Sequence, residues 1–125
     1  MVFPMPTSVL VVEDQADIRE TVAHLLERAG YVVHGAETPD EAIEILNRLP
    51  RPCILLWDAL MTRQRLSMLD AASLLGVHVA TLPVSLKFPR LVGSTKGETM
   101  KRLTSQDAIL SIVQEHCPLE ATGNR

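Results

Sequence analysis

Short apolar runs alternate along this chain with segments in which apolar residues recur every three or four positions. Continuous apolar runs are typical of strands buried on both faces, as in a parallel sheet, and the wider spacing is typical of helices that cover such a sheet. The predicted strands are residues 9–12, 31–36, 54–57, 77–84 and a short one around 98–100. The predicted helices are residues 17–29, 38–49, 66–75 and 105–117.

Local signals support several of these helix boundaries. Thr38 and Pro39, with Glu41 three residues after the threonine, predict a helix start, because Thr can cap the first turn and Pro favours its first position. Asp17 with a glutamate three residues on predicts a capping box for the first helix. Gly30 stands where a glycine commonly ends a helix.

The order of the elements predicts an α/β fold. Strands that alternate with helices indicate one parallel sheet with helices on both faces. We expect a flavodoxin-like (βα)5 three-layer sandwich whose five-stranded parallel sheet has the order 2-1-3-4-5. The fourth crossover is predicted to be short or irregular, because residues 86–97 contain a proline and two glycines. A single domain is expected over residues 8–117, with the leader 1–7 and the tail 118–125 loosely ordered.

Composition and charge exclude several classes of function. A length of 125 residues suits one domain with a hydrophobic core. The net charge of −3 and the absence of a basic run argue against nucleic-acid binding. No apolar stretch is long enough to span a membrane and the start lacks the features of a signal peptide, so we expect a cytoplasmic protein.

The positions of the cysteines and histidines in the sequence predict neither a disulfide framework nor a metal site. Cys53 and Cys117 are too few and too far apart for a disulfide framework, and we expect free buried thiols. The four histidines show no close metal-ligand spacing.

Acidic residues follow two of the predicted strands. Glu13 and Asp14 come directly after the first strand, and Asp58 ends the third. In the expected strand order these strands are neighbours, so the three carboxylates would meet at one edge of the sheet. Alone, each could be a polar strand end or a helix cap, but together, without His or Cys, they suit a hard divalent cation such as Mg²⁺. One carboxylate could then attack a phosphoryl group, and Lys101 could reach the same group from the end of the predicted fifth strand.

These residues give the chain a resemblance to bacterial response-regulator receiver domains, over roughly residues 8–117. The similar segments are residues 9–14, 55–58 and 100–103, and the two aspartates are separated by 58 − 14 = 44 residues, as is usual in that family. The resemblance implies that Asp58 accepts a phosphoryl group from a histidine kinase. It also implies that Mg²⁺ is held by Glu13, Asp14, Asp58 and the backbone carbonyl of Leu60.

The resemblance further assigns roles around the phosphoryl group. Lys101 would pair with it, and a hydroxyl at the end of strand four would move onto it. That hydroxyl is Thr81, which keeps the strand clear of Pro83, or Ser85, which stands at the more usual distance from the acceptor. The chain would then be a stand-alone receiver and no enzyme beyond self-phosphorylation and auto-dephosphorylation. It would act through an unknown downstream protein, as a monomer or weak homodimer.

Some positions depart from the family pattern. Thr62 replaces the usual proline four residues after the acceptor, Leu66 or a neighbour replaces a glycine, and Glu98 replaces an aromatic residue. Arg102 replaces the proline after the lysine, and we predict a trans 101–102 bond because a cis bond there would cost about 2.5–4 kcal/mol. These departures support an alternative: a pseudo-receiver that binds proteins without phosphorylation.

Two other chemistries fit the sequence poorly. A haloacid-dehalogenase-type phosphatase needs a second aspartate two residues after the first, and that position is Leu60. A flavodoxin-like flavin site needs a phosphate-binding loop rich in Ser, Thr and Gly after strand one, where this chain has acidic residues.

Overall fold

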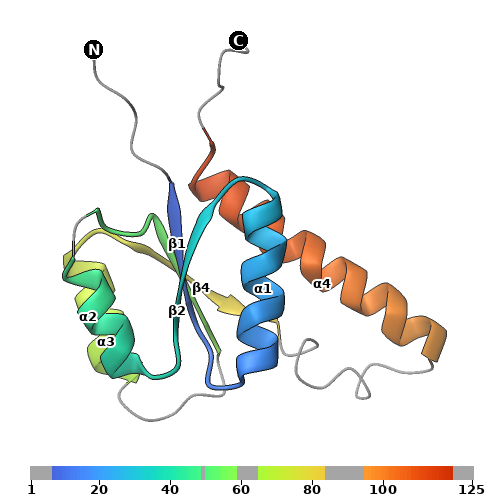
Figure 1. The fold of residues 1–125 in the computed structure, drawn as a ribbon, viewed down its shortest axis with the longest axis horizontal. Coiled ribbons are helices and arrows are strands. Elements are labelled where there is room, and N and C mark those ends of the chain that lie inside the picture. The colour runs from blue at the N-terminus through green and yellow to red at the C-terminus, as the bar shows by residue number, and fades with distance from the viewer. Residues whose placement is uncertain (1–6, 49, 59–64, 84–94, 120–125) are drawn as a thin grey trace.

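In the computed structural model, a parallel sheet lies between two layers of helices (Figure 1). The structure describes residues 7–48, 50–58, 65–83 and 95–119, with the backbone alone for residues 65 and 95–105. The strands are β1 (Ser8–Val12), β2 (Val32–Ala36), β3 (Ile54–Asp58) and β4 (His78–Leu82). The helices are α1 (Ala16–Arg28), α2 (Pro39–Leu46), α3 (Arg65–Leu74) and α4 (Thr95–His116).

The described strands lie in the order β2-β1-β3-β4, and each neighbouring pair is parallel. The predicted flavodoxin-like class and the order of the first four strands are therefore confirmed. Val12 is level with Ala36 on one side and with Trp57 on the other. The first three strands consequently end at one edge of the sheet, and the residues that follow β1 lie beside the end of β3.

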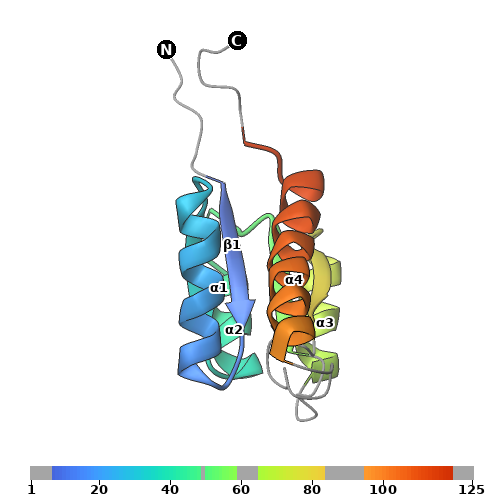
Figure 2. The same ribbon diagram turned by 90° about the vertical axis from the view of Figure 1, so that its right-hand side faces the viewer.

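Helices cover both faces of the sheet. α1 and α4 lie on one face, which Figure 2 shows from the front, and α2 and α3 lie on the other. All residues of β1 and β3 are buried, which explains the uninterrupted apolar runs at residues 9–12 and 54–57. The largest fully buried apolar side chains include Leu10, Leu26, Leu46, Ile54, Leu55, Leu56 and Met68.

The helix boundaries confirm some of the predicted signals and correct others. Thr38 caps α2, and its hydroxyl accepts a hydrogen bond from the backbone N–H of Glu41. Gly30 ends α1 with a φ of 105°, a conformation that glycine adopts without strain. The capping box predicted at Asp17 is wrong, because α1 begins at Ala16 and Asp17 already lies in its first turn. At that position its carboxylate interacts favourably with the positive end of the helix dipole.

The strand predicted around residues 98–100 is wrong. These residues belong to α4, which begins at Thr95, whereas the sequence predicted a helix from Ser105. Glu98, Met100 and Lys101 are strong helix formers, whereas Thr99 between them is β-branched and favours strands, so the local sequence did not distinguish the two structures. Within the described residues the sheet thus has four strands, and residues 84–94 of the predicted fourth crossover lie outside them.

The expectation of free thiols is also wrong. Cys53 and Cys117 form a disulfide, with Cα atoms 6.0 Å apart. The two cysteines are 64 residues apart in the sequence, so the sequence alone did not indicate that they pair. They meet because α4 ends beside the start of β3. The hydroxyl of Tyr31 donates a hydrogen bond of 2.8 Å to the carbonyl of Cys117. Burial raises the pKa of Tyr31 above its ordinary value, so this donor stays protonated at neutral pH.

Among the described helices, none combines the length and the apolar character that crossing a membrane requires.

Candidate functional site

The structure brings together the three acidic residues that the sequence placed at one edge of the sheet. Glu13 and Asp14 follow β1, and Asp58 is the last residue of β3. One carboxylate oxygen from each lies within 4.8 Å of the other two. Glu13 is only 1% exposed and Asp58 only 6%, whereas Asp14 faces solvent. The cluster is therefore open on one side and buried on the other.

Backbone hydrogen bonds fix the position of Glu13. Its N–H donates to the carbonyl of Ala36 at 3.0 Å, which extends the pairing of β1 with β2 by one residue. Its side-chain Oε1 accepts a hydrogen bond of 3.2 Å from the N–H of Gln15. The carboxylate of this buried residue is thus oriented by the turn that leads into α1.

Arg19 is a positioning residue that sequence reasoning missed. From the first part of α1, its Nη1 donates a 2.6 Å hydrogen bond to the carbonyl of Glu13. The side chain passes over Gly35 of β2, where a Cβ would lie 3.1 Å from Cδ of Arg19. The glycine therefore leaves room for the arginine. No specific pattern in the sequence marks this contact, because the acceptor is a backbone carbonyl.

If the acidic cluster holds Mg²⁺, Arg19→Met should weaken that binding by about tenfold, because the loss of a hydrogen bond from a charged donor is worth ~1.5 kcal/mol or more. The methionine keeps the aliphatic contact over Gly35 but cannot hold the carbonyl of Glu13. Titration calorimetry measures the affinity. Arg28→Met, in the last turn of the same helix, is the matched control, and Arg19→Lys should restore part of the binding. Equal affinity of Arg19→Met and the wild type would contradict this role.

The donor set fits a hard divalent cation. Three carboxylates within 4.8 Å supply oxygen ligands, and no histidine or cysteine belongs to the group. Mg²⁺ prefers such ligands and needs only a few from the protein, because it keeps several waters. A cation there would also offset the mutual repulsion of the carboxylates.

The structure describes the remaining predicted site residues only in part. Thr81 lies in β4, level with Trp57 and one position before the partner of Asp58, and its side chain is exposed. Lys101 lies within α4 and not at a strand end, so its predicted location is wrong, while its side chain lies outside the described part of the chain. Ser85 and Leu60 also lie outside the described residues, so the choice of switch hydroxyl and the backbone ligand stay predictions.

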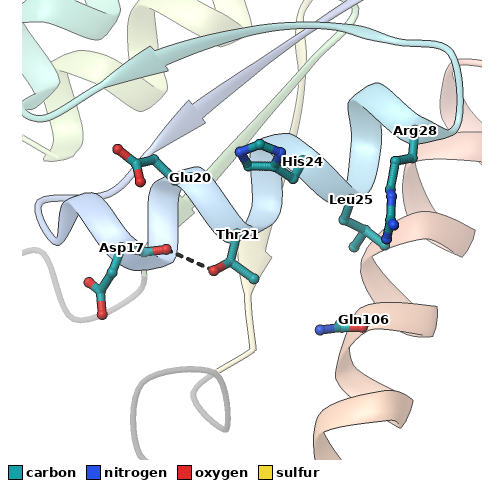
Figure 3. A pocket seen from close by; sticks show the side chains of 7 residues that line it. All are labelled: Asp17, Glu20, Thr21, His24, Leu25, Arg28 and Gln106. Atoms are coloured by element: carbon teal, nitrogen blue, oxygen red, sulfur yellow. Dashed lines mark hydrogen bonds between the residues drawn. The ribbon is translucent and has the colours of Figure 1, made fainter.

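A hollow of about 470 Å³ lies between α1 and α4 (Figure 3). Both acidic and basic side chains line it, and the hydroxyl of Thr21 donates to the carbonyl of Asp17 at its rim. None of the three clustered carboxylates belongs to its lining, so this hollow is separate from the acidic site. Its lining residues are Asp17, Glu20, Thr21, His24, Leu25, Arg28 and Gln106.

Comparison with known proteins identifies similar folds. The chain matches no protein-family model and no curated protein sequence. It is similar to the bacteriophytochrome response regulator AtBRR, with 18% identity over 98% of this chain and 100% of that one, and a TM-score of 0.64. It is also similar to the receiver domain of the hybrid histidine kinase CckA, with 22% identity over 79% and 97% of the two chains and a TM-score of 0.50. The chain therefore has the receiver-domain fold.

Proposed function

We propose that this chain is a phosphoacceptor receiver domain of a two-component signalling system. The observation that supports it most is the convergence of three carboxylates within 4.8 Å at the carboxyl edge of a receiver fold. In this proposal Asp58 accepts the phosphoryl group. Glu13, Asp14, Asp58 and the backbone carbonyl of Leu60 hold Mg²⁺.

Each group has one role in the proposed phosphoryl transfer. A carboxylate oxygen of Asp58 attacks phosphorus, and the bond from phosphorus to the donor breaks, so an aspartyl-phosphate forms. Bound Mg²⁺ supplies positive charge beside the phosphoryl oxygens. Lys101 pairs with the same oxygens, and the hydroxyl of Thr81 or Ser85 turns toward them. The hydrogen bonds on Glu13 keep one ligand in place while the site changes charge.

The proposal also implies partners. The donor would be a histidine kinase, and the signal would pass to a downstream protein in the cytoplasm. The chain would work as a monomer or weak homodimer, and it would catalyse only its own phosphorylation and dephosphorylation.

The test is the intact mass of the protein after incubation with acetyl phosphate, with and without Mg²⁺. We expect a single phosphoryl adduct that requires Mg²⁺ and that hydroxylamine removes, as it does other acyl phosphates. A folded sample that forms no adduct under either condition would overturn the proposal.

The second candidate is a pseudo-receiver that binds proteins without phosphorylation. A specific observation favours it: Lys101 belongs to the continuous helix α4, whereas the resemblance requires a lysine at a strand end. The mass measurement separates the two functions, because a pseudo-receiver needs no adduct.

A further inference from the structure

A disulfide joins the end of the last helix to the start of a central strand. α4 lies beside α1 on one face of the sheet (Figure 2). Cys117 follows the end of α4, and it is bonded to Cys53, which precedes β3. A helix takes no part in the backbone pairing of the strands, so side-chain contacts and this bond hold the end of α4 in place. A change at the bond therefore acts on α4 and leaves the pairing of the sheet intact.

The non-covalent contacts at the end of α4 do not need the disulfide. Ile109 and Val113 are buried in the apolar cluster on this face of the sheet, one helical turn apart. The hydroxyl of Tyr31 donates a hydrogen bond to the carbonyl of Cys117, which is a backbone group. The reduced protein keeps all of these contacts, so we expect it to stay folded with α4 held less tightly.

The two sulfur-bearing residues differ in their access to solvent. Cys117 is 2% exposed and belongs to the buried apolar cluster, whereas Cys53 is partly exposed and packs at the edge of that cluster. Thiol–disulfide exchange begins with the attack of an external thiolate on an accessible sulfur. A small thiol in solution therefore reaches Cys53 first, and Cys117 is the leaving group.

An acceptor for the reduced Cys53 thiol is already in place. Sγ of Cys53 lies 3.5 Å from the carbonyl oxygen of His116, the last residue of α4. In the disulfide this sulfur carries no proton, but after reduction the thiol can donate a weak hydrogen bond to that carbonyl. This bond would keep the Cys53 sulfur beside the end of α4. The disulfide can then form again without refolding of the chain.

We propose that Cys53 and Cys117 form a reversible thiol–disulfide switch that sets how tightly the end of α4 is held on the sheet. The thiolate of a small thiol such as glutathione attacks Sγ of Cys53, the S–S bond breaks, and the Cys117 sulfur leaves with the electron pair and takes a proton. A second thiolate attacks the reductant's sulfur in the mixed disulfide. This step releases Cys53, which also takes a proton, and the disulfide of the reductant. Oxidised glutathione reverses both steps.

The two states differ in the freedom of α4. In the oxidised form the bond keeps the end of the helix beside β3. In the reduced form the end can open locally, so that Ile109 and Val113 leave the apolar cluster while the sheet stays paired. Gln106 of the same helix lines the hollow between α1 and α4. The surface that these two helices present together therefore depends on the redox state.

The first test is incubation of the native protein in glutathione buffers, without denaturant. Alkylation of free thiols followed by intact mass gives the fraction of reduced protein. We expect an excess of reduced glutathione to open the disulfide and oxidised glutathione to restore it, with the circular dichroism of a folded protein throughout. A disulfide that stays closed in the reducing buffer, or that does not form again, would overturn the proposal.

The second test is amide hydrogen exchange of the oxidised and reduced protein. Reduction should speed exchange at residues 108–117 by about tenfold or more, and by more than in β1 and β3, because local opening releases the helix end alone. The double variant Cys53→Ser, Cys117→Ser is the control and should exchange alike with and without the reductant. An equal change in α4 and the sheet, or no change, would show that the disulfide does not control α4.

Single variants test the order of attack. With oxidised glutathione, Cys117→Ser should form a mixed disulfide at Cys53 faster than Cys53→Ser forms one at the buried Cys117. Intact mass over time gives both rates, and the opposite order would contradict the assigned roles. No step depends on phosphorylation, so these outcomes are independent of the proposed function.

Discussion

Asp58→Asn is expected to abolish the phosphoryl adduct completely. Asparagine has nearly the shape of aspartate, but its amide is not a nucleophile that can form an acyl phosphate. Asp58 is only 6% exposed at the end of β3. Because asparagine fills the same space, the substitution leaves the strand and its neighbours in place. It also removes one of three charges within 4.8 Å, so the metal-free protein should not become less stable.

The measurement compares intact masses after identical incubation with acetyl phosphate and Mg²⁺. Asp70→Asn, an exposed aspartate in α3, is the matched control and should form as much adduct as the wild type. Melting curves of all samples show that each is folded. An undiminished adduct on Asp58→Asn would mean that another residue is the acceptor.

The double variant Cys53→Ser, Cys117→Ser should lower the free energy of unfolding by about 2–5 kcal/mol relative to the oxidised wild type. The disulfide closes a long loop, with a separation of 64 residues, and so restricts the unfolded chain. In the folded state it fixes the end of α4 beside β3, where Tyr31 also holds the Cys117 carbonyl. Serine has a similar size, so most of the loss reflects the missing cross-link.

Urea unfolding followed by circular dichroism measures this difference. The wild type with a reductant should shift toward the midpoint of the double variant, and the variant itself should not respond to the reductant. A midpoint equal to that of the oxidised wild type would show that the disulfide contributes nothing to stability.

The sequence was sufficient for the elements whose buried faces leave a clear pattern. β1 and β3 are buried throughout, so their apolar runs predicted both strands and their central position. Because neighbouring parallel strands end at one edge, the meeting of Glu13, Asp14 and Asp58 followed from the strand order alone.

The remaining differences arise where local patterns are weak. Residues 95–105 have only two apolar residues, and Gly97 and three threonines among them are poor helix formers, so the local pattern did not predict the helix found there. The Cys53–Cys117 contact joins residues whose proximity depends on the path of the whole chain, and no spacing motif marks it. The hydrogen bond from Arg19 to a backbone carbonyl likewise carries no specific sequence signature.

The positions of Thr7 and Leu119 have a practical consequence for engineering. The backbone N–H of Val32 donates a hydrogen bond to the carbonyl of Thr7, and Cδ1 of Leu119 would be 2.9 Å from a Cβ on Gly30, so both residues lie beside the connection between α1 and β2. That connection is at the amino edge of the sheet. A fluorescent protein fused before Thr7 or after Leu119 would therefore leave the carboxylates unobstructed. A short linker joining the same two points would allow a circular permutant with its new ends elsewhere.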